Sequence, residues 1–227
     1  MLSGNHSKTD TGKWMAVVNP NAGGRKGEKD WPGISRLLDE AGIGYDHVLT
    51  GHRGHAIELT ENAIAAGFRQ FIVVGGDGTL NELVNGVFRQ KTCDPKEILI
   101  AMVPVGTGND WGRMYGFPKK YRKAVNLIRK GRHFTQDVGH IRYHDEEGEQ
   151  ERYFVNVSGM GYDALVAEKT NRMKEKGKGG TLSYLLNIFT GLFQYRYVHF
   201  IITLDGSEVF NGKVLSMNLG ICRYNGG

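Results

Sequence analysis

Residues 71–82, with the sequence FIVVGGDGTLNE, decide how this chain folds. The first four are β-branched or aromatic, which is typical of a buried strand. Thr79 and Glu82 have the spacing of a capping box, which predicts that a helix begins at Thr79. The following apolar side chains recur with the period of one helix face, at Leu80, Leu83, Val84, Val87 and Phe88. Residues 75–79 are therefore predicted to form a glycine-rich turn from a strand into a helix.

This turn has the properties of a phosphate-binding site. Glycine leaves backbone N–H groups accessible to a ligand, and a helix N-terminus carries a partial positive charge. Asp77 would repel a phosphate unless a cation lay between them, so the first hypothesis is a site for a nucleotide with Mg²⁺. Glycine-rich turns are also common in α/β folds in general, and the sequence has neither G-x-x-x-x-G-K-[ST] nor an early G-x-G-x-x-G. The turn alone leaves both interpretations open.

The composition is that of an ordinary globular protein with a small excess of positive charge. At 227 residues the chain can form one large or two small domains. A net charge of +5 favours anionic partners without selecting among nucleotides, lipid headgroups and nucleic acid. Cys93 and Cys222 are far apart and neither belongs to a C-x-x-C pair, which predicts a reduced, cytoplasmic protein without structural zinc. The polar N-terminus does not resemble a signal peptide, and no run is long and apolar enough to span a bilayer.

The first 132 residues alternate between short apolar runs and helical patterns. Near-continuous apolar strands of this kind predict a parallel sheet covered by helices on both faces. The strands are expected at 14–18, 45–50, 71–74 and 98–103, and the helices around 34–41, 54–66, 79–88 and 121–128.

Four polar loops should meet at one edge of this sheet. Right-handed crossovers bring the loops after all strands to the carboxyl edge, where ligands of open α/β sheets bind. These loops are residues 19–24, Thr50, residues 75–79 and residues 106–110.

The second half has the pattern of antiparallel β structure. A domain boundary is placed near residues 131–134, which gives an α/β nucleotide-binding domain at 1–132 and a β-rich domain at 133–227. Asp205-Gly206 predicts a hairpin turn, and a helical insert is expected between residues 164 and 195. Strands are expected at 141–143, 153–157, 198–204, 209–213 and 214–221.

Three aspartates are candidates for catalysis and metal binding. Asp77 and Asp110 each follow a predicted parallel strand, and two carboxylates beside a phosphate site suit Mg²⁺. In the alternative, Asp77 only stabilises its own turn and Asp110 only caps a short helix. Asp137 stands at the start of the second domain, where it either completes the network or belongs to an ordinary turn.

An ordered series of motifs resembles the diacylglycerol kinase catalytic-domain family, which includes bacterial lipid kinases and is related to sphingosine and ceramide kinases. The resemblance extends over nearly the whole chain from Trp14. It implies a Rossmann-like, NAD kinase-like domain and a β-sandwich, with transfer of the γ-phosphate of ATP to the hydroxyl of a diacylglycerol-like lipid. The motifs are NPNAGG at 19–24, Thr50 with GHA at 54–56, GGDGTLNE at 75–82, PVGTGND at 104–110, DVG at 137–139 and FVNVSGMGYDA at 154–164.

The resemblance also implies roles for individual residues. Asp77, Asp110 and Asp137 would form the carboxylate network around a catalytic Mg²⁺, in keeping with phosphoryl transfer by positioning and charge neutralisation. The family's general base lies in an acidic segment that follows a Gly-Gly. This sequence ends at Asn225-Gly226-Gly227, so the base is expected beyond Gly227, and the chain is expected to be a fragment with an incomplete sandwich. ATP would be held by Asn19, Asn21, Gly23, Gly24, Thr50, Gly75, Gly76, Asp77, Gly78, Thr79, Leu80, Asn81, Glu82, Gly106 and Thr107.

Two stretches bear on contact with a membrane. The apolar stripe of the predicted insert, between Gly179 and Tyr195, either meets the bilayer or forms a core helix under the sandwich. A basic cluster at 119–132 is either a solvated helix face or a surface that faces a membrane. The expected partner is a lipid at the membrane surface, with peripheral contact. No nucleic acid is expected, because aromatic residues do not alternate with the basic ones, and the sequence does not indicate an oligomeric state.

Two other functions remain as alternatives. A nicotinamide-nucleotide kinase shares Gly-Gly-Asp-Gly-Thr, but it does not show the segments at 19–24 and 104–110 in this form. A catalytically incompetent regulator that binds nucleotide or lipid would lack the C-terminal acid.

Overall fold

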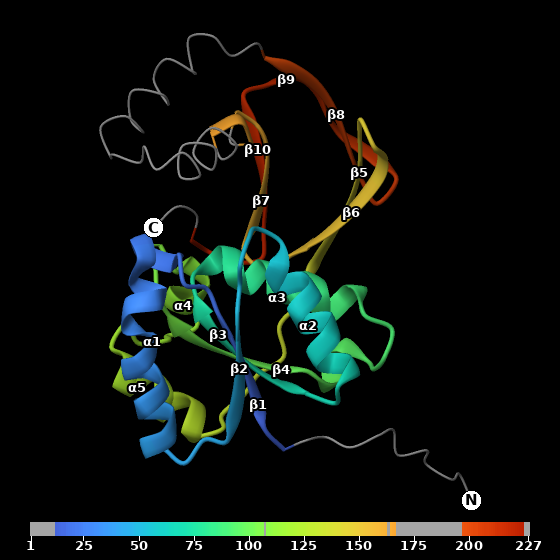
Figure 1. Ribbon diagram of the computed structural model, residues 1–227. Helices are drawn as coiled ribbons and strands as arrows, with labels where there is room; N and C mark the ends of the chain where they lie inside the picture. Colours follow the sequence, from blue (N-terminus) through green and yellow to red (C-terminus); the bar gives the residue numbers. More distant parts are fainter. Residues whose placement is uncertain (1–11, 107, 163, 167–196, 225–227) are drawn as a thin grey trace, which may run out of the picture. The chain divides into compact units, whose positions relative to one another are not determined.

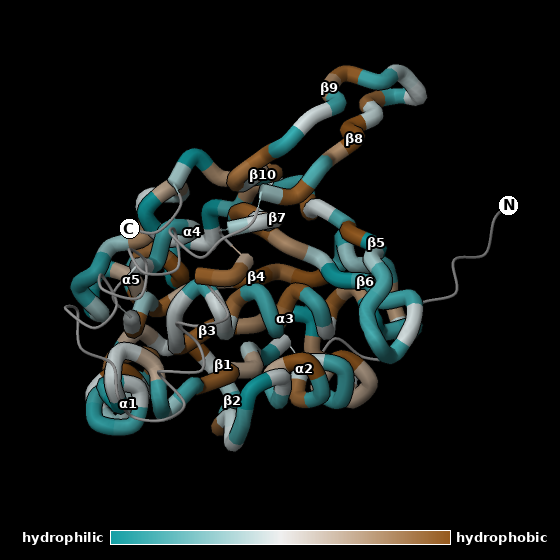
Figure 2. Tube along the Cα trace, turned by 90° about the horizontal axis from the view of Figure 1, so that it is seen from above, coloured by the Kyte–Doolittle hydropathy of each residue, from teal (hydrophilic) through white to brown (hydrophobic). Residues whose placement is uncertain are grey.

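The first part of the chain forms a parallel sheet, as predicted. The computed structural model describes residues 12–106, 108–162, 164–166 and 197–224. Figure 1 labels strands β1 (Trp14–Val18), β2 (Tyr45–Leu49), β3 (Gln70–Gly75) and β4 (Leu99–Pro104). They lie in the order β2-β1-β3-β4, which can be followed in Figure 2. All three pairings are parallel, with Val18 beside Val74 and Val74 beside Val103. The four strands therefore end at the same edge of the sheet.

Helices cover both faces of this sheet. Helices α2 (His55–Ala65) and α3 (Asp77–Arg89) pack on one face with Val17, Val73 and Met102. Helices α1 (Ala22–Glu40) and α5 (Tyr121–Arg129) pack on the other face with Ala16, Ile72 and Val103. Hydrophobic residues accordingly concentrate along β3 and β4 in Figure 2. Because successive residues of a strand point to opposite faces, burial on both sides explains the near-continuous apolar strands.

Two helix starts differ from the sequence prediction. Helix α3 begins at Asp77 and not at Thr79, with Gly76 as an N-cap residue that makes no side-chain capping bond. The predicted capping box is wrong, because the side chains of Thr79 and Glu82 bind other loops. Helix α1 extends from Ala22, much earlier than expected, although the left-handed backbone at 23–25 interrupts its first turn. Short helices α4 (Asp110–Met114) and η1 (Pro95–Glu97) flank β4.

Helix α3 also holds a β-hairpin that follows the sheet. Strands β5 (Gly139–Asp145) and β6 (Gly148–Phe154) are antiparallel. The buried side chain of Asn85 donates to the backbone O of Tyr153 at 2.8 Å and accepts from its backbone N at 3.0 Å. Phe88, one turn further along α3, stacks on the Tyr153 ring with centroids 4.7 Å apart. These contacts attach β6 to α3.

Replacing Asn85 with alanine should loosen this attachment. The backbone N–H and C=O of Tyr153 would both lose their partner in a partly buried position, which lowers the free energy of unfolding by about 2–3 kcal/mol. Asn62→Ala on the exposed side of α2 is the control, with an expected change within about 0.5 kcal/mol. Urea denaturation measures both. Equal stability of the two variants would contradict the role of Asn85.

The remaining strands form two antiparallel pairs. Strands β7 (Val157–Gly161) and β10 (Ser216–Gly220) pair with each other, and β8 (Val198–Leu204) pairs with β9 (Ser207–Val214). Asp205 and Gly206 connect β8 to β9 with φ angles of 49° and 82°, so the predicted hairpin is confirmed. The single strand predicted at 153–157 is wrong. The chain leaves β6 at Phe154 and enters β7 at Val157 with a different partner.

Contacts divide the chain into two compact units. One unit ends at Asn156 and includes the chain again from Ile221, and the other spans Val157–Gly220. Residues 133–156 group with the parallel sheet because α3 holds β6. The predicted domains, 1–132 and 133–227, rest on the change of sequence pattern near residues 131–134 and stay a prediction. Apart from 164–166, the predicted helical insert lies outside the described residues, and none of the described helices is long and apolar enough to cross a membrane.

Candidate active site

Loops after β1, β2, β3 and β4 meet at the carboxyl edge of the sheet. Asn19, directly after β1, donates from Nδ2 to Thr79 Oγ1 at 2.9 Å, and its backbone N donates to Val74 O at 2.9 Å. Thr50, directly after β2, is buried and donates from its backbone N to Val18 O at 2.9 Å. The backbone of Val105 donates to Gly75 O at 2.8 Å. The predicted convergence of these loops is confirmed among the described residues; Thr107 lies outside them.

Three of these loops approach one another through glycine backbone. A Cβ atom on Gly106 would lie 3.5 Å from Gly76 Cα, and one on Gly23 would lie 3.6 Å from Gly106 Cα. The nearest atoms belong to side chains, Asn109 Oδ1 at 3.1 Å for Gly106 and Lys26 Cβ at 3.4 Å for Gly23, and the distances to backbone are those of van der Waals contact. The sequence predicted glycine here for access to a ligand, and at Gly23 the structure adds a second reason, which is a left-handed backbone with φ of 61°.

Asp77 connects the turn after β3 to the helix after β4. Its Oδ2 accepts a hydrogen bond from the backbone N of Asp110 at 2.9 Å, and its Oδ1 accepts one from Trp111 N at 3.0 Å. Both N–H groups belong to the first turn of α4, whose N-cap residue Asn109 makes no side-chain capping bond. Asp77 therefore caps a neighbouring helix instead of stabilising only its own turn. Each oxygen still has a second acceptor direction, which a cation can use.

The other two predicted metal ligands differ in their surroundings. Asp110 is 6% exposed and lies next to Asp77 through the backbone bond just described. Asp137 is exposed, and its neighbour Gln136 accepts a bond from Trp111 Nε1 at 2.6 Å. The segment that carries Asp137 is thus attached beside α4. Within the described part of the chain, no three acidic, histidine or cysteine side chains are grouped as a metal-binding set, so a shared cation for Asp77, Asp110 and Asp137 stays a prediction.

Asn109 also belongs to this region, although it is not among the predicted site residues. It has a left-handed backbone, with φ of 51°, and it is 5% exposed. Its Nδ2 donates to Gly106 O at 2.9 Å, which fixes the orientation of the amide. Among the described residues, its Oδ1 has no hydrogen-bond partner, although it lies close to the backbone of Gly76 and Gly106. The signal in the sequence was asparagine before Asp110, since asparagine tolerates left-handed backbone.

Several predicted nucleotide-binding residues have structural contacts of their own. The Leu80 side chain is buried in the core, so only its backbone is left to contact a ligand. Asn21 is exposed, and its backbone N donates to Asn19 Oδ1 at 3.0 Å. Glu82 accepts bonds from Gly54 N at 2.9 Å and from Ala56 N at 3.3 Å. The Glu82 carboxylate therefore binds the N-terminus of α2, and its contact with a nucleotide stays a prediction.

Replacing Glu82 with alanine should destabilise the first turn of α2 in the ligand-free protein. A carboxylate that caps a helix and lies at its positive end contributes about 1–2 kcal/mol. Amide hydrogen exchange over residues 54–57 should accelerate accordingly. Glu58→Ala in the same turn is the control, because Glu58 is exposed and should change exchange much less. Unchanged exchange in Glu82→Ala would show that its carboxylate does not hold α2.

Residues 221–224 return to the first unit beside these groups, which no sequence signal indicated. The Cys222 thiol donates to Val155 O at 3.2 Å. Burial raises the pKa of Cys222, and the carboxylates of Asp77 and Asp110 raise this pKa further. The thiol is therefore neutral near pH 7 and adds no negative charge to the site.

Comparison with known proteins identifies the family to which this chain belongs. A family model for the diacylglycerol kinase catalytic domain matches residues 13–141, which is more than half of the chain. The chain therefore belongs to the diacylglycerol kinase catalytic-domain family. It is 31% identical over 205 residues to a diacylglycerol kinase of Staphylococcus carnosus, and the match covers 90% of this chain. Over the whole length of this chain, the identity to a diacylglycerol kinase of Mycobacterium tuberculosis is 29%.

Solved structures of diacylglycerol kinases are also similar to this chain. A crystal structure of a diacylglycerol kinase from Bacillus anthracis matches 94% of this chain with a TM-score of 0.64 and 26% identity. A second crystal structure, of a candidate diacylglycerol kinase from the same organism, matches 96% with a TM-score of 0.68. The chain spans 62% of the length of the Staphylococcus carnosus relative and 70% of the Mycobacterium tuberculosis relative.

Proposed function

We propose that this protein transfers the γ-phosphate of ATP to the hydroxyl of a diacylglycerol-like lipid, with Mg²⁺ as the metal. Membership of the family and the names of its relatives support this choice of reaction. The observation that carries the proposal is the position of Asp77. It lies in the first turn of α3, and both of its oxygens are oriented by the first turn of α4.

The residues at this edge suit the triphosphate. The first N–H groups of α3 have no partners within their own helix, and the positive end of the helix favours an anion. Gly78 is exposed in this turn, so the backbone around it is accessible. The turn would orient the phosphates of ATP. The bond that Asn19 donates to Thr79 and the bond that the Asp110 backbone N donates to Asp77 hold the loops together.

The oxygen atoms near Asp77 suit a hard cation. Asp77 and the adjacent Asp110 offer carboxylate oxygens. On the neighbouring loop lies Oδ1 of buried Asn109, which has no partner among the described residues. Such oxygen donors are the ones that Mg²⁺ prefers. When bound, Mg²⁺ would neutralise phosphate charge during transfer. Asp137 would join this set, because its neighbour Gln136 attaches this segment to Trp111 of α4.

The Gly78→Ala variant separates ligand binding from folding. No atom of the described residues lies within 4 Å of the place that a Cβ on Gly78 would occupy, and the backbone of Gly78 is not left-handed. Alanine should therefore keep or slightly raise the melting temperature, because it favours helix more than glycine does. It should raise the KM for ATP by about tenfold, since a methyl group would stand where the backbone approaches phosphate. An unchanged KM would contradict phosphate binding at this turn.

The substrate class is tested with radiolabelled ATP and the intact protein. Diacylglycerol in mixed micelles should become labelled in the presence of Mg²⁺, whereas NAD should not. Labelling of NAD alone would support the nicotinamide-nucleotide kinase alternative. Binding of ATP with no labelled product from either acceptor would support the regulator that lacks catalysis.

A further inference from the structure

The outer surface of α5 is strongly cationic and includes none of the residues of the candidate active site. Residues 111–136 contain eight lysines and arginines and no acidic residue. Seven of these cations lie in α5 or next to its ends, and all seven are exposed. We call them the α5 basic face: Lys119, Lys120, Arg122, Lys123, Arg129, Lys130 and Arg132.

Core packing does not require these charges. Helix α5 packs against the sheet through Ala124, Val125 and Ile128, which are 0%, 2% and 8% exposed. The helical period places Lys123 and Lys130 away from this apolar side. A mixture of acidic and basic residues would keep an outer face equally soluble, so the absence of acids indicates an anionic partner.

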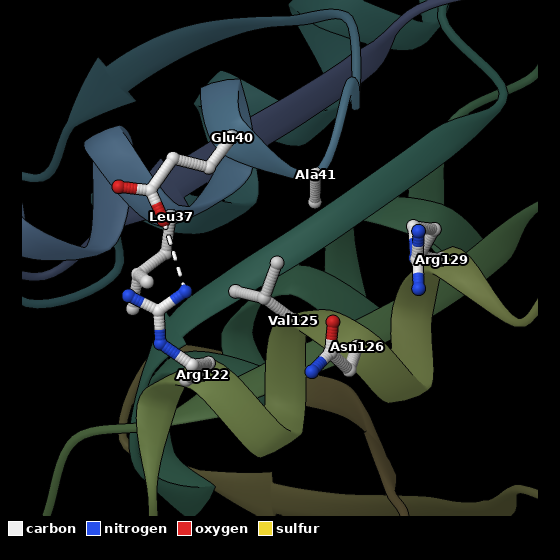
Figure 3. Close-up of a pocket in the computed structure, with 7 residues that line it drawn as sticks. All are labelled: Leu37, Glu40, Ala41, Arg122, Val125, Asn126 and Arg129. Carbon is white, nitrogen blue, oxygen red and sulfur yellow. Dashed lines mark hydrogen bonds and ion pairs between the residues drawn. The ribbon is translucent and has the colours of Figure 1, made fainter.

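Neighbouring acids neutralise little of the α5 basic face. Arg122 forms an ion pair with Glu40 of α1 at 3.0 Å, which Figure 3 shows. The Asp30 carboxylate, also on α1, accepts a hydrogen bond from the Tyr121 hydroxyl at 2.7 Å. Across residues 12–106, 108–162, 164–166 and 197–224, no ion pair joins the other six cations to an acid.

The shape of this surface favours an extended partner over a single anion. The depression between α1 and α5 in Figure 3 has a volume of about 100 Å³, with Arg122 and Arg129 among its lining residues. Pockets for small ligands are several times larger, at about 300–1,000 Å³. The cations instead follow a helix about 14 Å long and continue beyond both of its ends. A planar array of negative charges can contact many of them at once.

We propose that the α5 basic face docks on an anionic lipid bilayer. The proposal rests on the proposed function in one respect, which is that the substrate of a lipid kinase lies in a bilayer. Each lysine or arginine near an anionic membrane increases binding by about fivefold, so a group of this size provides stable peripheral attachment. Nucleic acid is less well suited, because Tyr121 is half-buried and bonded to Asp30, which leaves no exposed aromatic ring in α5 to stack on bases.

Sedimentation with vesicles tests the proposal on the intact protein without ATP. The protein should bind vesicles of equal parts phosphatidylcholine and phosphatidylglycerol, and it should not bind phosphatidylcholine alone. Lys123→Glu/Lys130→Glu should reduce binding by at least about twentyfold. The matched control is Lys91→Glu/Lys96→Glu, which makes the same charge change at exposed positions before β4 and should reduce binding far less. Thermal melting verifies that both variants are folded.

Three results would overturn the proposal. These are no binding to the anionic vesicles, an equal loss in the control variant, and preferential binding to duplex DNA over vesicles. Labelling of a dispersed short-chain diacylglycerol tests the proposed function without a bilayer. Failure of that reaction together with normal vesicle binding would reject the proposed function and leave the docking surface standing.

Discussion

Replacing Asp77 with asparagine should reduce phosphoryl transfer to diacylglycerol by about a thousandfold or more. The variant removes the negative charge that would face Mg²⁺ beside the phosphates. It should also lower the free energy of unfolding by about 1–3 kcal/mol, because an amide can offer only one acceptor oxygen to the two N–H groups of α4. Initial rates at saturating ATP and urea denaturation measure the two effects.

Asp110→Asn distinguishes the chemical effect of Asp77 from the structural one. Asp110 bonds to Asp77 through its backbone N, which the substitution keeps, so α4 should stay in place. A loss of activity of at least about a hundredfold in Asp110→Asn, with a smaller change in stability, would assign the effect to charge. Wild-type turnover in Asp77→Asn would reject the role assigned to Asp77, and full activity in Asp110→Asn would reject the role assigned to Asp110.

Replacing Gly27 with alanine should give the largest loss of stability among these substitutions. Gly27 is buried in α1, and a Cβ there would overlap the backbone carbonyl of Asn19 and lie 3.1 Å from Pro20 O. Neither carbonyl can move without moving the loop after β1. Overpacking against backbone should lower the free energy of unfolding by about 3 kcal/mol, which corresponds to a melting temperature roughly 6–12 °C lower.

Gly33→Ala in the same helix is the matched control for Gly27→Ala. No described atom lies within 4 Å of its Cβ position, and its backbone is not left-handed. Alanine there should stabilise the protein by about 0.5–1 kcal/mol through its helix propensity. The Gly27 variant should also bind ATP more weakly, because the displaced loop carries the Asn19 side chain that bonds to Thr79. Equal melting temperatures for the two variants would contradict this steric argument.

Much of the fold could be predicted because its signals are local. The apolar runs at 14–18 and 71–74 became β1 and β3 within one residue of the predicted bounds, and Asp205-Gly206 became a hairpin turn. Parallel pairing followed from the alternation of strands and helices, and the meeting of four loops followed from parallel pairing. The predicted meeting of these loops at the carboxyl edge is therefore confirmed, whereas the site roles and ligands assigned to their residues stay predictions.

The contacts of individual side chains could not be predicted in the same way. Asp77, Glu82 and Asn85 bind backbone that lies 33, 28 and 68 residues away in the sequence. The capping-box prediction failed for this reason, since a local pattern does not include a competing partner from another loop. Asn109 and the return of residues 221–224 were missed because neither follows from periodicity.

The sequence by itself determined the order and polarity of the elements, because hydrophobic period and turn chemistry act over a few residues. It also determined which loops share the carboxyl edge, since parallel strands leave no other arrangement for them. Only the tertiary structure decided that Asp77 caps α4 and that Glu82 caps α2. The physical reason is that an unpaired N–H group at a helix N-terminus donates a hydrogen bond to any carboxylate that the fold brings within reach, whatever its distance along the chain.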